Sequence, residues 1–415
     1  MTNSFIVGVG MTPLSKHLTL SVKQLTAMAV DAALQDAGIT REAIEAAWFC
    51  NTRQGALEGQ HGIRGQCSLR AYGFEGIAIF NTDNACASSS SGLMQAHAAV
   101  TAGIYDVALV VGAEKMNYPE KRTEMFEAFK GSWDRELADA HMQALLAMGE
   151  GLELPPEAFA DSGDRSVFMD IYAAQARFHM HRFGTTQRQI ATVAAKNHWH
   201  SQFNPLAQYQ KPMTVDEVLA DKLISWPITR SMCAPMSDGA CAIVVASKKA
   251  LHKFRKDRAV GIRGMAVSSG TQRTPDQVER HLTRIAADKA YEVAGVGPKD
   301  ISFAELHDAS AIAEILHTEN CGFCDYGDGG ALVESGETQL GGKRPINVSG
   351  GLLSKGHPIG ATGAIQVHEI VTQLRGEAGK RQVANPRFGM TENGGGFYGL
   401  EEAACVVGIF EAPSA

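Results

Sequence analysis

The feature that most constrains this chain of 415 residues is an internal repeat on the scale of a domain. Residues 27–44 read AMAVDAALQDAGITREAI, and residues 284–301, at an offset of 257, read RIAADKAYEVAGVGPKDI. Each segment has the apolar periodicity of a helix that ends at a glycine and is followed by a short apolar strand. A second match, at an offset of 271, aligns Gly92–His97 with Gly363–His368. The repeat predicts that one supersecondary unit is used twice.

Short apolar runs rich in β-branched residues flank these helices and are expected to be strands buried on both faces. The expected strands are Phe5–Val9, Ala46–Cys50, Val107–Gly112, Ala240–Ala246, Phe303–Leu306 and Ala403–Phe410. A helix is expected from just after Cys86 to about Thr101. Alternation of such strands with helices favours an α/β fold in which helices pack on sheets.

The segment from Lys115 to about Met236 interrupts this alternation, because it is rich in charged residues, Met, His and turn formers. We interpret it as a mostly helical insertion in the first half, of the kind that shapes a substrate site. An independent small domain is the alternative. The expected division is a first half over residues 1–250, with the insertion at about 115–236, and a second half over residues 251–415.

Composition excludes several classes of protein. Hydrophobic residues make up 45% and charged residues 20%, which is the balance of a globular chain and not of a disordered one. The net charge of −7 argues against a nucleic-acid partner, because phosphate contacts need a positive field. No apolar run reaches the ~18 residues that span a bilayer, and no secretory signal is visible at the N-terminus. We expect a cytoplasmic protein that binds neither nucleic acid nor membranes.

The eight cysteines are thinly spread, so reduced thiols are expected and a disulfide framework is not. Cys86 lies among small residues, in Asn84-Ala-Cys-Ala-Ser-Ser-Ser-Ser-Gly92, directly before an expected helix. Small residues let backbone and ligand approach closely, and the partial positive charge of a helix N-terminus favours the thiolate. These are the conditions for a nucleophilic cysteine. A buried packing residue is the alternative.

The repeat adds two histidines to this cysteine. His357, in Gly-His-Pro-Ile-Gly-Ala-Thr-Gly, is equivalent to Cys86 at the offset of 271. His307, in Glu-Leu-His-Asp-Ala-Ser, is equivalent to Cys50 at the offset of 257. If the halves pack about a pseudo-twofold axis, the thiol and the His357 imidazole face each other as nucleophile and base. A hydrogen-bonded structural histidine is the alternative at each position.

A glycine triplet, Gly394–Gly396, precedes the last expected strand. Glycines permit unusual backbone conformations and expose N–H groups to a ligand. The N–H of Gly394 together with that of Cys86 is a candidate pair of donors for an oxyanion. A plain tight turn is the alternative.

These motifs together resemble the four catalytic loops of the thiolase family. The motifs are Asn84-Ala-Cys86-Ala-Ser-Ser, His307-Asp308-Ala, Gly356-His357-Pro358-Ile-Gly-Ala-Thr-Gly and Asn393-Gly-Gly-Gly, and Ser237-Asp-Gly-Ala240 resembles the hairpin before a core strand. The likeness extends over essentially the whole chain and includes acetyl-CoA acetyltransferase-like enzymes. The His-Asp loop is similar to that of the sterol-carrier-protein branch of the family.

The resemblance implies a thiolase fold, in which two βαβαβαββ halves build a five-layer α-β-α-β-α sandwich with an inserted loop domain. It implies an acyltransferase that makes or cleaves a 3-oxoacyl-CoA by Claisen chemistry, with coenzyme A as substrate or product and no metal in this chain. Cys86 would carry the acyl group, His357 would take the thiol proton, and His307 would stabilise the enolate. A homodimer or tetramer is also implied, and several relatives work with a small OB-fold, zinc-containing partner protein.

This chain departs from the family at one catalytic position. Family members use a second cysteine as acid/base at the α-carbon, whereas Glu392 and Ala309 occupy the two places expected for it here. Glu392 is a possible acid/base if burial raises its pKa, and His357 or His307 are the alternatives. Two other functions stay open: a carbon–carbon lyase of the retro-aldol type, and a non-catalytic subunit that binds acyl-CoA.

Overall fold

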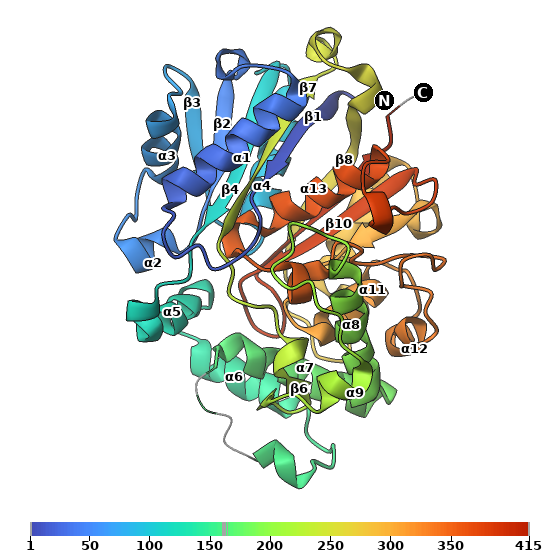
Figure 1. The fold of residues 1–415 in the computed structure, drawn as a ribbon. Coiled ribbons are helices and arrows are strands. Elements are labelled where there is room, and N and C mark those ends of the chain that lie inside the picture. Colours follow the sequence, from blue (N-terminus) through green and yellow to red (C-terminus); the bar gives the residue numbers. More distant parts are fainter. Residues whose placement is uncertain (1, 160–162, 164, 414–415) are drawn as a thin grey trace.

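The computed structural model describes residues 2–159, 163 and 165–413. In this part of the chain, nine strands form a mixed sheet in the order β3-β2-β4-β7-β1-β8-β11-β10-β9 (Figure 1). Their bounds are β1 Ser4–Met11, β2 Ala46–Cys50, β3 Ala78–Thr82, β4 Val107–Glu114, β7 Gly239–Ser247, β8 Val260–Ser269, β9 Phe303–Glu305, β10 Phe388–Gly395 and β11 Ala404–Glu411. A separate two-stranded hairpin consists of β5 (Leu223–Ser225) and β6 (Ile228–Thr229).

Helices pack on both faces of these strands, and further helices lie at one end of the molecule (Figure 1). Their bounds are α1 Val22–Ala37, α2 Gln54–Glu58, α3 Arg64–Tyr72, α4 Ser88–Thr101, α5 Arg122–Phe129, α6 Ala138–Ala147, α7 Val167–Phe183, α8 Gln187–Ser201, α9 Val215–Leu219, α10 Leu282–Ala294, α11 Ala311–Asn320, α12 Gly329–Glu334 and α13 Thr362–Leu374. Among the described residues, no helix has the length and apolar character needed to cross a lipid bilayer.

The duplication seen in the sequence is present in the sheet. The first half contributes five strands to this sheet, since β5 and β6 form the separate hairpin. Numbered along the chain, they lie in the order third, second, fourth, fifth and first, which is β3-β2-β4-β7-β1. In the second half, β9-β10-β11-β8 repeat this order without a third strand, whose place next to β9 is held by a single bridge between Ala304 and Ile346. The two halves join where β1 pairs with β8 over only two positions, Phe5 with Gly261 and Ile6 with Val260.

Five layers follow from the packing of the helices. Helix α1 covers the outer face of the first-half strands, and α10 covers the outer face of the second-half strands. Helices α4 and α13 pack against each other and against strands of both halves, so they form the middle layer. The thiolase-type α/β sandwich predicted from the sequence is therefore confirmed.

The repeated helix-and-glycine segment has the local structure that its sequence predicts. Ser21 begins α1 with a capping box to Gln24, and Gly38 ends it with a left-handed φ of 68°. Helix α10 ends in the same way at Gly295, where φ is 67°. The six expected strands and the helix after Cys86 are also present, within two residues of their predicted ends.

Strands β3, β8 and β10 were not predicted from the sequence. The Gly394–Gly396 segment precedes the last strand, β11, as expected, and residues 394 and 395 also form the end of β10. Glycine has low β-propensity, and pairing with β11 along the whole of β10 overrides that preference. Tertiary pairing, and not local sequence, determines this strand.

The segment between β4 and β7 contains α5 to α9 and the β5–β6 hairpin, and it lies at one end of the molecule, drawn in green (Figure 1). Its helices α7 and α8 share a hydrophobic core with residues of the second half, among them Ala309, Ile312 and Leu352. The insertion therefore packs onto the segments of the second half near His307 and His357 instead of building a core of its own. The division of the chain at residues 250 and 251 stays a prediction.

Candidate active site

Cys86 lies in a tight turn between β3 and α4. Ala85 has a left-handed φ of 49°, which costs a non-glycine residue about 1 kcal/mol and marks a strained turn. The Ser88 hydroxyl closes the turn, because it donates to the Ala85 carbonyl at 2.6 Å and accepts the Asn84 N–H at 2.9 Å. The turn holds the half-buried Cys86 side chain at the start of α4.

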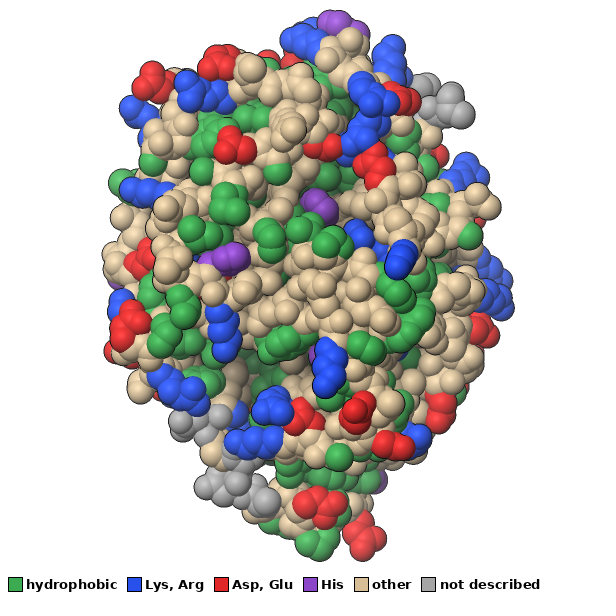
Figure 2. Space-filling model, in the orientation of Figure 1, with side chains coloured by type: hydrophobic (Ala, Val, Ile, Leu, Met, Phe, Trp, Pro, Cys, Tyr) green, Lys and Arg blue, Asp and Glu red, His purple; other side chains and the backbone are tan. Residues whose placement is uncertain are grey.

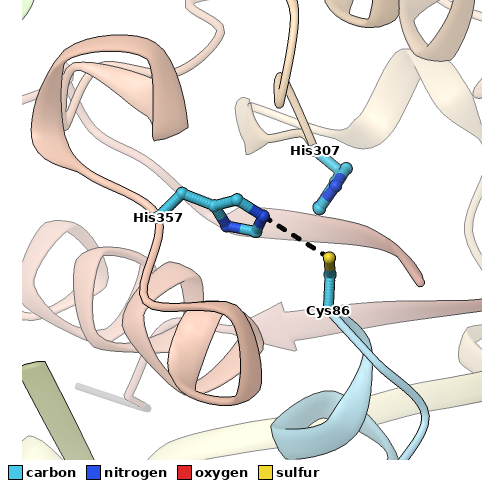
Figure 3. A group of neighbouring side chains, drawn as sticks. All are labelled: Cys86, His307 and His357. Carbon is cyan, nitrogen blue, oxygen red and sulfur yellow. Dashed lines mark hydrogen bonds between the residues drawn. The ribbon is translucent and has the colours of Figure 1, made fainter. Parts of the chain in front are cut away.

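The three side chains predicted from the sequence lie together (Figure 3). The sulfur of Cys86 is 3.4 Å from Nε2 of His357, across the junction of the two halves. One ring nitrogen of each histidine and the sulfur all lie within 4.8 Å of one another. Atoms of this type and spacing could also hold a zinc ion, so the expectation of a metal-free site stays a prediction.

Hydrogen bonds fix the tautomer of His357. The Thr362 hydroxyl lies 2.7 Å from Nδ1 of His357 and donates its own proton to the Pro358 carbonyl at 3.2 Å. The hydroxyl therefore accepts from Nδ1–H, which leaves the lone pair on Nε2 directed at the Cys86 thiol. Burial lowers the pKa of His357 well below its usual value, so the ring is neutral and can accept a proton.

His307 has the opposite tautomer. The Ser90 hydroxyl donates to Oδ1 of Asn393 at 2.7 Å, which orients the amide so that its NH₂ group faces His307. The Asn393 amide nitrogen lies 3.0 Å from Nδ1 of His307 and donates to it, so the proton of the neutral ring is on Nε2. Burial lowers the pKa of His307 to about 3 and keeps it neutral. His307 therefore presents a hydrogen-bond donor to the site.

The protonation state of Cys86 differs from the expectation. Burial raises the pKa of Cys86 to about 12, and the opposing effects of the Arg53 guanidinium and the Gly396 N–H are smaller. Desolvation of the sulfur outweighs the partial charge of the α4 N-terminus. The resting residue is thus a thiol, and its activation depends on proton transfer to His357.

Gly394 does not have the expected place at the site. It pairs with Cys405 inside the β10–β11 hairpin, whereas Gly395 and Gly396 line the cavity beside Cys86. A Cβ at 395 would be 2.2 Å from the Asn84 carbonyl oxygen, so only glycine permits this contact between β10 and the cysteine loop. The candidate backbone donor is Gly396, whose N–H interacts with the Cys86 sulfur.

Glu392 also differs from its expected role. Its carboxylate accepts the backbone N–H of His307 at 3.0 Å and contacts the Cys405 thiol at 3.2 Å and the Thr283 hydroxyl at 3.3 Å. Burial raises its pKa to about 7, as was expected of an acid/base. However, Glu392 is not among the residues that line the cavity, because its strand directs it behind the His307 loop.

Cys86, His307 and His357 lie in the wall of a cavity of about 340 Å³. Aromatic and apolar side chains make up most of the wall, with contributions from Met116, Phe126, Phe129, Phe168, Tyr172 and Phe397. Most of these residues come from the insertion, as was predicted for the segment that shapes the site. Arg122, Arg165 and Arg230, far apart in the sequence, also line the cavity. In Figure 2, Lys and Arg side chains stand around a hollowed area near the insertion where apolar side chains are visible.

Two buried carboxyl groups hold the loops around the candidate site in position. Asp308 accepts the backbone N–H of Leu352 at 2.6 Å and so fixes the segment that leads to His357. Glu114, at the end of β4, accepts the N–H of Gly360 at 3.0 Å and that of Arg53 at 3.0 Å. These groups support the backbone on both sides of the site and lie outside the cavity wall.

Several polar residues of the candidate site were not predicted from the sequence: Ser90, Thr362, Asn393 and Glu402. The first three lie inside the motifs quoted from the sequence. Their hydroxyl and amide groups could have been considered there as hydrogen-bond partners of the two histidines. Glu402 lies in the connection between β10 and β11 and lines the cavity. No spacing signal in the sequence distinguishes it from its neighbour Glu401.

Comparison with known protein families agrees with this architecture. Residues 4–225 match the thiolase N-terminal domain, and residues 265–408 match the thiolase C-terminal domain-like family. The chain belongs to the thiolase family.

Two relatives align over nearly the whole chain. An acetyl-CoA acetyltransferase of Methanothermobacter thermautotrophicus is 33% identical, over 95% of this chain and 97% of the relative. Sterol carrier protein 2 of Oryctolagus cuniculus is 34% identical, over 97% of this chain and 71% of the relative.

Solved structures are similar in fold. The Ltp2-ChsH2(DUF35) aldolase superposes with a TM-score of 0.77 at 24% identity, over 100% of this chain and 99% of the other. Human mitochondrial 3-ketoacyl-CoA thiolase in complex with CoA superposes with a TM-score of 0.68 at 15% identity, over 100% and 98% of the two chains.

Proposed function

We propose that this protein is a thiolase-type acyltransferase that cleaves or forms a 3-oxoacyl-CoA through an acyl group carried on Cys86. The observation that carries the proposal is the 3.4 Å contact between the Cys86 sulfur and an unprotonated His357 nitrogen, next to a hydrogen-bond donor on His307. Nucleophile, base and oxyanion donor are the three parts that acyl transfer requires.

In the cleavage direction, His357 takes the thiol proton and the Cys86 thiolate attacks the 3-oxo carbon of the substrate. The N–H groups of Cys86 and Gly396 are placed to hold the oxyanion that forms there. Nε2–H of His307 is placed to stabilise the enolate of the departing acyl-CoA. Each such donor typically lowers the activation free energy by about 3 kcal/mol. Free coenzyme A then takes the acyl group from Cys86.

Coenzyme A and protein partners extend the proposal. The cavity-lining arginines Arg122, Arg165 and Arg230 are cations of the kind that the phosphates of coenzyme A require. The relatives whose names include CoA, and a neighbour solved with CoA, support this assignment.

We further propose a cytoplasmic homodimer or tetramer of the 44.3 kDa chain, which sedimentation would detect as twice or four times that mass. We also propose a small OB-fold, zinc-containing partner protein, as expected for the sterol-carrier-protein branch of the family.

Thiolysis of a 3-oxoacyl-CoA by free coenzyme A tests the proposal. Loss of the 3-oxo substrate is followed by absorbance for the wild type, for Cys86→Ala and for Cys67→Ala. Cys67 is a half-buried cysteine of α3 that lies outside the cavity, so its variant controls for general loss of a thiol. We expect activity in the wild type and Cys67→Ala, and none in Cys86→Ala. Undiminished turnover by Cys86→Ala would contradict the proposal.

A retro-aldol lyase is the second candidate function. The absence of a cysteine at both 392 and 309, together with the likeness in fold to the Ltp2-ChsH2(DUF35) aldolase, favours it. A lyase of this type needs a base but no acyl-cysteine. It therefore predicts cleavage of a 3-hydroxyacyl-CoA that survives the Cys86→Ala substitution, a result that the acyltransferase proposal does not allow.

A further inference from the structure

Acyl transfer by Cys86 leaves one chemical step without a residue. A proton must be added to, or removed from, the carbon next to the thioester carbonyl, and a positioned acid/base is needed for this. Neither Ala309 nor Glu392 provides one, because alanine has no titratable group and the Glu392 carboxylate faces away from the cavity. The wall of the cavity contains a single carboxyl side chain within the described residues, that of Glu402.

Glu402 is built into the site by the β10–β11 hairpin. Its side chain is 3% exposed and shares the cavity wall with Cys86, His307 and His357. Gly394 makes room for it, because a Cβ at 394 would be 2.8 Å from Cγ of Glu402. The glycine-rich segment thus has a second function, since it accommodates this glutamate as well as the approach of the cysteine loop.

The carboxyl group of Glu402 has spare hydrogen-bonding capacity. Its Oε2 atom is buried and has no hydrogen-bond partner among the described residues. Two histidine rings lie within 4 Å of the carboxyl group: Nε2 of His281 is 3.8 Å from Oε2, and Nε2 of His317 is 3.7 Å from Oε1. Glu401, the adjacent residue, is not among the residues of the cavity wall and pairs with Arg273 at 2.6 Å. A buried carboxyl oxygen without a partner, in a cavity wall, is unusual in a purely structural residue.

We propose that Glu402 is the acid/base that acts at the α-carbon of the substrate, in the place that a second cysteine holds in the thiolase family. The proposal rests on the proposed acyltransferase function. It assigns a catalytic residue that lies ten positions beyond Glu392.

The step balances as follows. When the Cys86 thiolate has added to the 3-oxo carbon, the bond between C2 and C3 breaks and its electron pair forms the enolate of the departing acyl-CoA. The Glu402 carboxyl gives its proton to C2, and the enolate oxygen returns its electron pair to the thioester carbonyl. The Glu402 carboxylate then regains a proton from solvent, while the incoming coenzyme A thiol releases its proton to solvent, so the residue ends the cycle as it began. In the reverse direction the carboxylate removes a proton from C2.

The environment of Glu402 suits this exchange. Burial raises its pKa to about 8, and the charge of Glu392 acts in the same direction. The titratable and charged groups that face it from the surrounding elements are Cys86, Tyr172, Arg273, His281, His317, Glu392 and Glu401. His281 and His317 are kept neutral by burial, which lowers the pKa of each. The carboxyl is therefore protonated near pH 7 and ionised above about pH 8.

Exchange of the α-protons of an acyl-CoA for deuterium isolates this step from acyl transfer. Acetyl-CoA and hexanoyl-CoA are incubated with the enzyme in D₂O, and mass spectrometry measures both deuterium in the acyl-CoA and the acyl adduct on Cys86. For Glu402→Gln we expect Cys86 to be acylated while exchange falls by ~10²-fold or more. Wild-type exchange should rise with pH to a plateau above about 8, because the carboxylate is the base. Glu402→Asp should recover part of the exchange.

Glu75→Gln is the matched control, because it makes the same chemical change at an exposed residue outside the cavity wall. Its exchange should stay within about twofold of the wild type. Exchange by Glu402→Gln within twofold of the wild type, or loss of Cys86 acylation in that variant, would overturn the assignment of Glu402. Absence of an acyl adduct in the wild type would instead overturn the acyltransferase function on which it rests. If Glu402→Gln does not fold, Glu402→Asp with unchanged exchange and unchanged pH profile would also overturn it.

Discussion

His307 and His357 are the same residue type in the same cavity, but their hydrogen bonds give them opposite functions. A hydroxyl accepts from Nδ1 of His357, and an amide donates to Nδ1 of His307. One ring therefore presents a lone pair to the cavity, and the other presents an N–H. Because burial lowers the pKa of both, neither function is lost by protonation at neutral pH.

Thr362→Val tests the control of the His357 tautomer. Valine has nearly the shape of threonine but cannot accept from Nδ1–H, so the ring can move its proton to Nε2 and lose its base function. We expect acylation of Cys86 to slow by ~10- to 100-fold, part of the ~10²–10⁴ that a positioned base contributes. Thr362→Ser keeps the hydroxyl and should retain most of the rate. Stopped-flow or quenched-flow acylation measures both, and equal rates for Thr362→Val and the wild type would contradict this function of Thr362.

At the scale of elements, the site depends on the crossing of α4 and α13 in the middle layer. Gly363, at the start of α13, lies so close to α4 that a Cβ there would be 1.8 Å from Oγ of Ser90 and 2.7 Å from Oδ1 of Asn393. Ser90 and Asn393 are the residues that orient His307. The crossing of the two helices therefore determines which nitrogen of His307 carries the proton.

Gly363→Ala should damage stability and catalysis together. Overpacking of a close helix crossing costs ~1–3 kcal/mol, and displacement of Asn393 would free the His307 ring. We expect a lower midpoint in urea unfolding and a loss of thiolysis in the protein that remains folded. Gly62→Ala is the control, because that glycine is exposed and a Cβ there meets nothing within 4 Å. Wild-type stability in Gly363→Ala would contradict the close approach of α4 and α13 at Gly363.

The same crossing explains which parts of the site could be predicted from the sequence. The repeat placed Cys86 and His357 at equivalent points of two halves, and pseudo-twofold packing brings them to 3.4 Å. His307 was found by the same argument. These residues were predictable because each lies next to an element that the local sequence predicts: Cys86 before α4, His357 before α13 and His307 after β9.

Gly394, Glu392 and Glu402 were not predictable in this way. Their positions depend on β10, whose end is made of glycines that carry no strand signal, and on its register with β11. A shift of one residue along a strand exchanges the two faces, so the orientation of Glu392 toward or away from the cavity cannot be deduced from spacing. The raised pKa of Cys86 was also missed, because burial of the sulfur is a tertiary property.

At the scale of the whole molecule, the junction between the halves and the insertion buries many ionisable groups. Burial raises the pKa values of Glu114 and Glu392 to about 7 and that of Glu402 to about 8. It lowers the pKa values of His307 and His317 to about 3. These shifts make the free energy of unfolding depend on pH in opposite directions.

We expect the thermal stability to decrease as pH rises above about 6.5. Below that pH the histidines gain protons in the unfolded state only, which destabilises the fold. Above it the histidines are neutral in both states, while the three glutamates still hold protons in the folded state only, so stability falls as pH rises through about 8. The decrease between pH 6.5 and 8.5 should be roughly 3 kcal/mol at most, or several °C in the unfolding midpoint.

Glu402→Gln should flatten this decrease, because glutamine does not titrate, and the exposed Glu75→Gln should leave it unchanged. Differential scanning calorimetry across the pH range measures the three profiles. A wild-type midpoint that rises steadily from pH 6.5 to 8.5 would contradict the raised pKa values of the buried glutamates.

The central claim is that Cys86 accepts an acyl group because the two halves bring His357 to its sulfur. The most direct test is mass spectrometry of the intact protein and its peptides after brief incubation with a panel of acyl-CoA thioesters and an acid quench. The account predicts a mass increase equal to one acyl group, located on the peptide that contains Cys86 and absent from His357→Asn. An adduct on another cysteine, or none with any thioester of the panel, would contradict it.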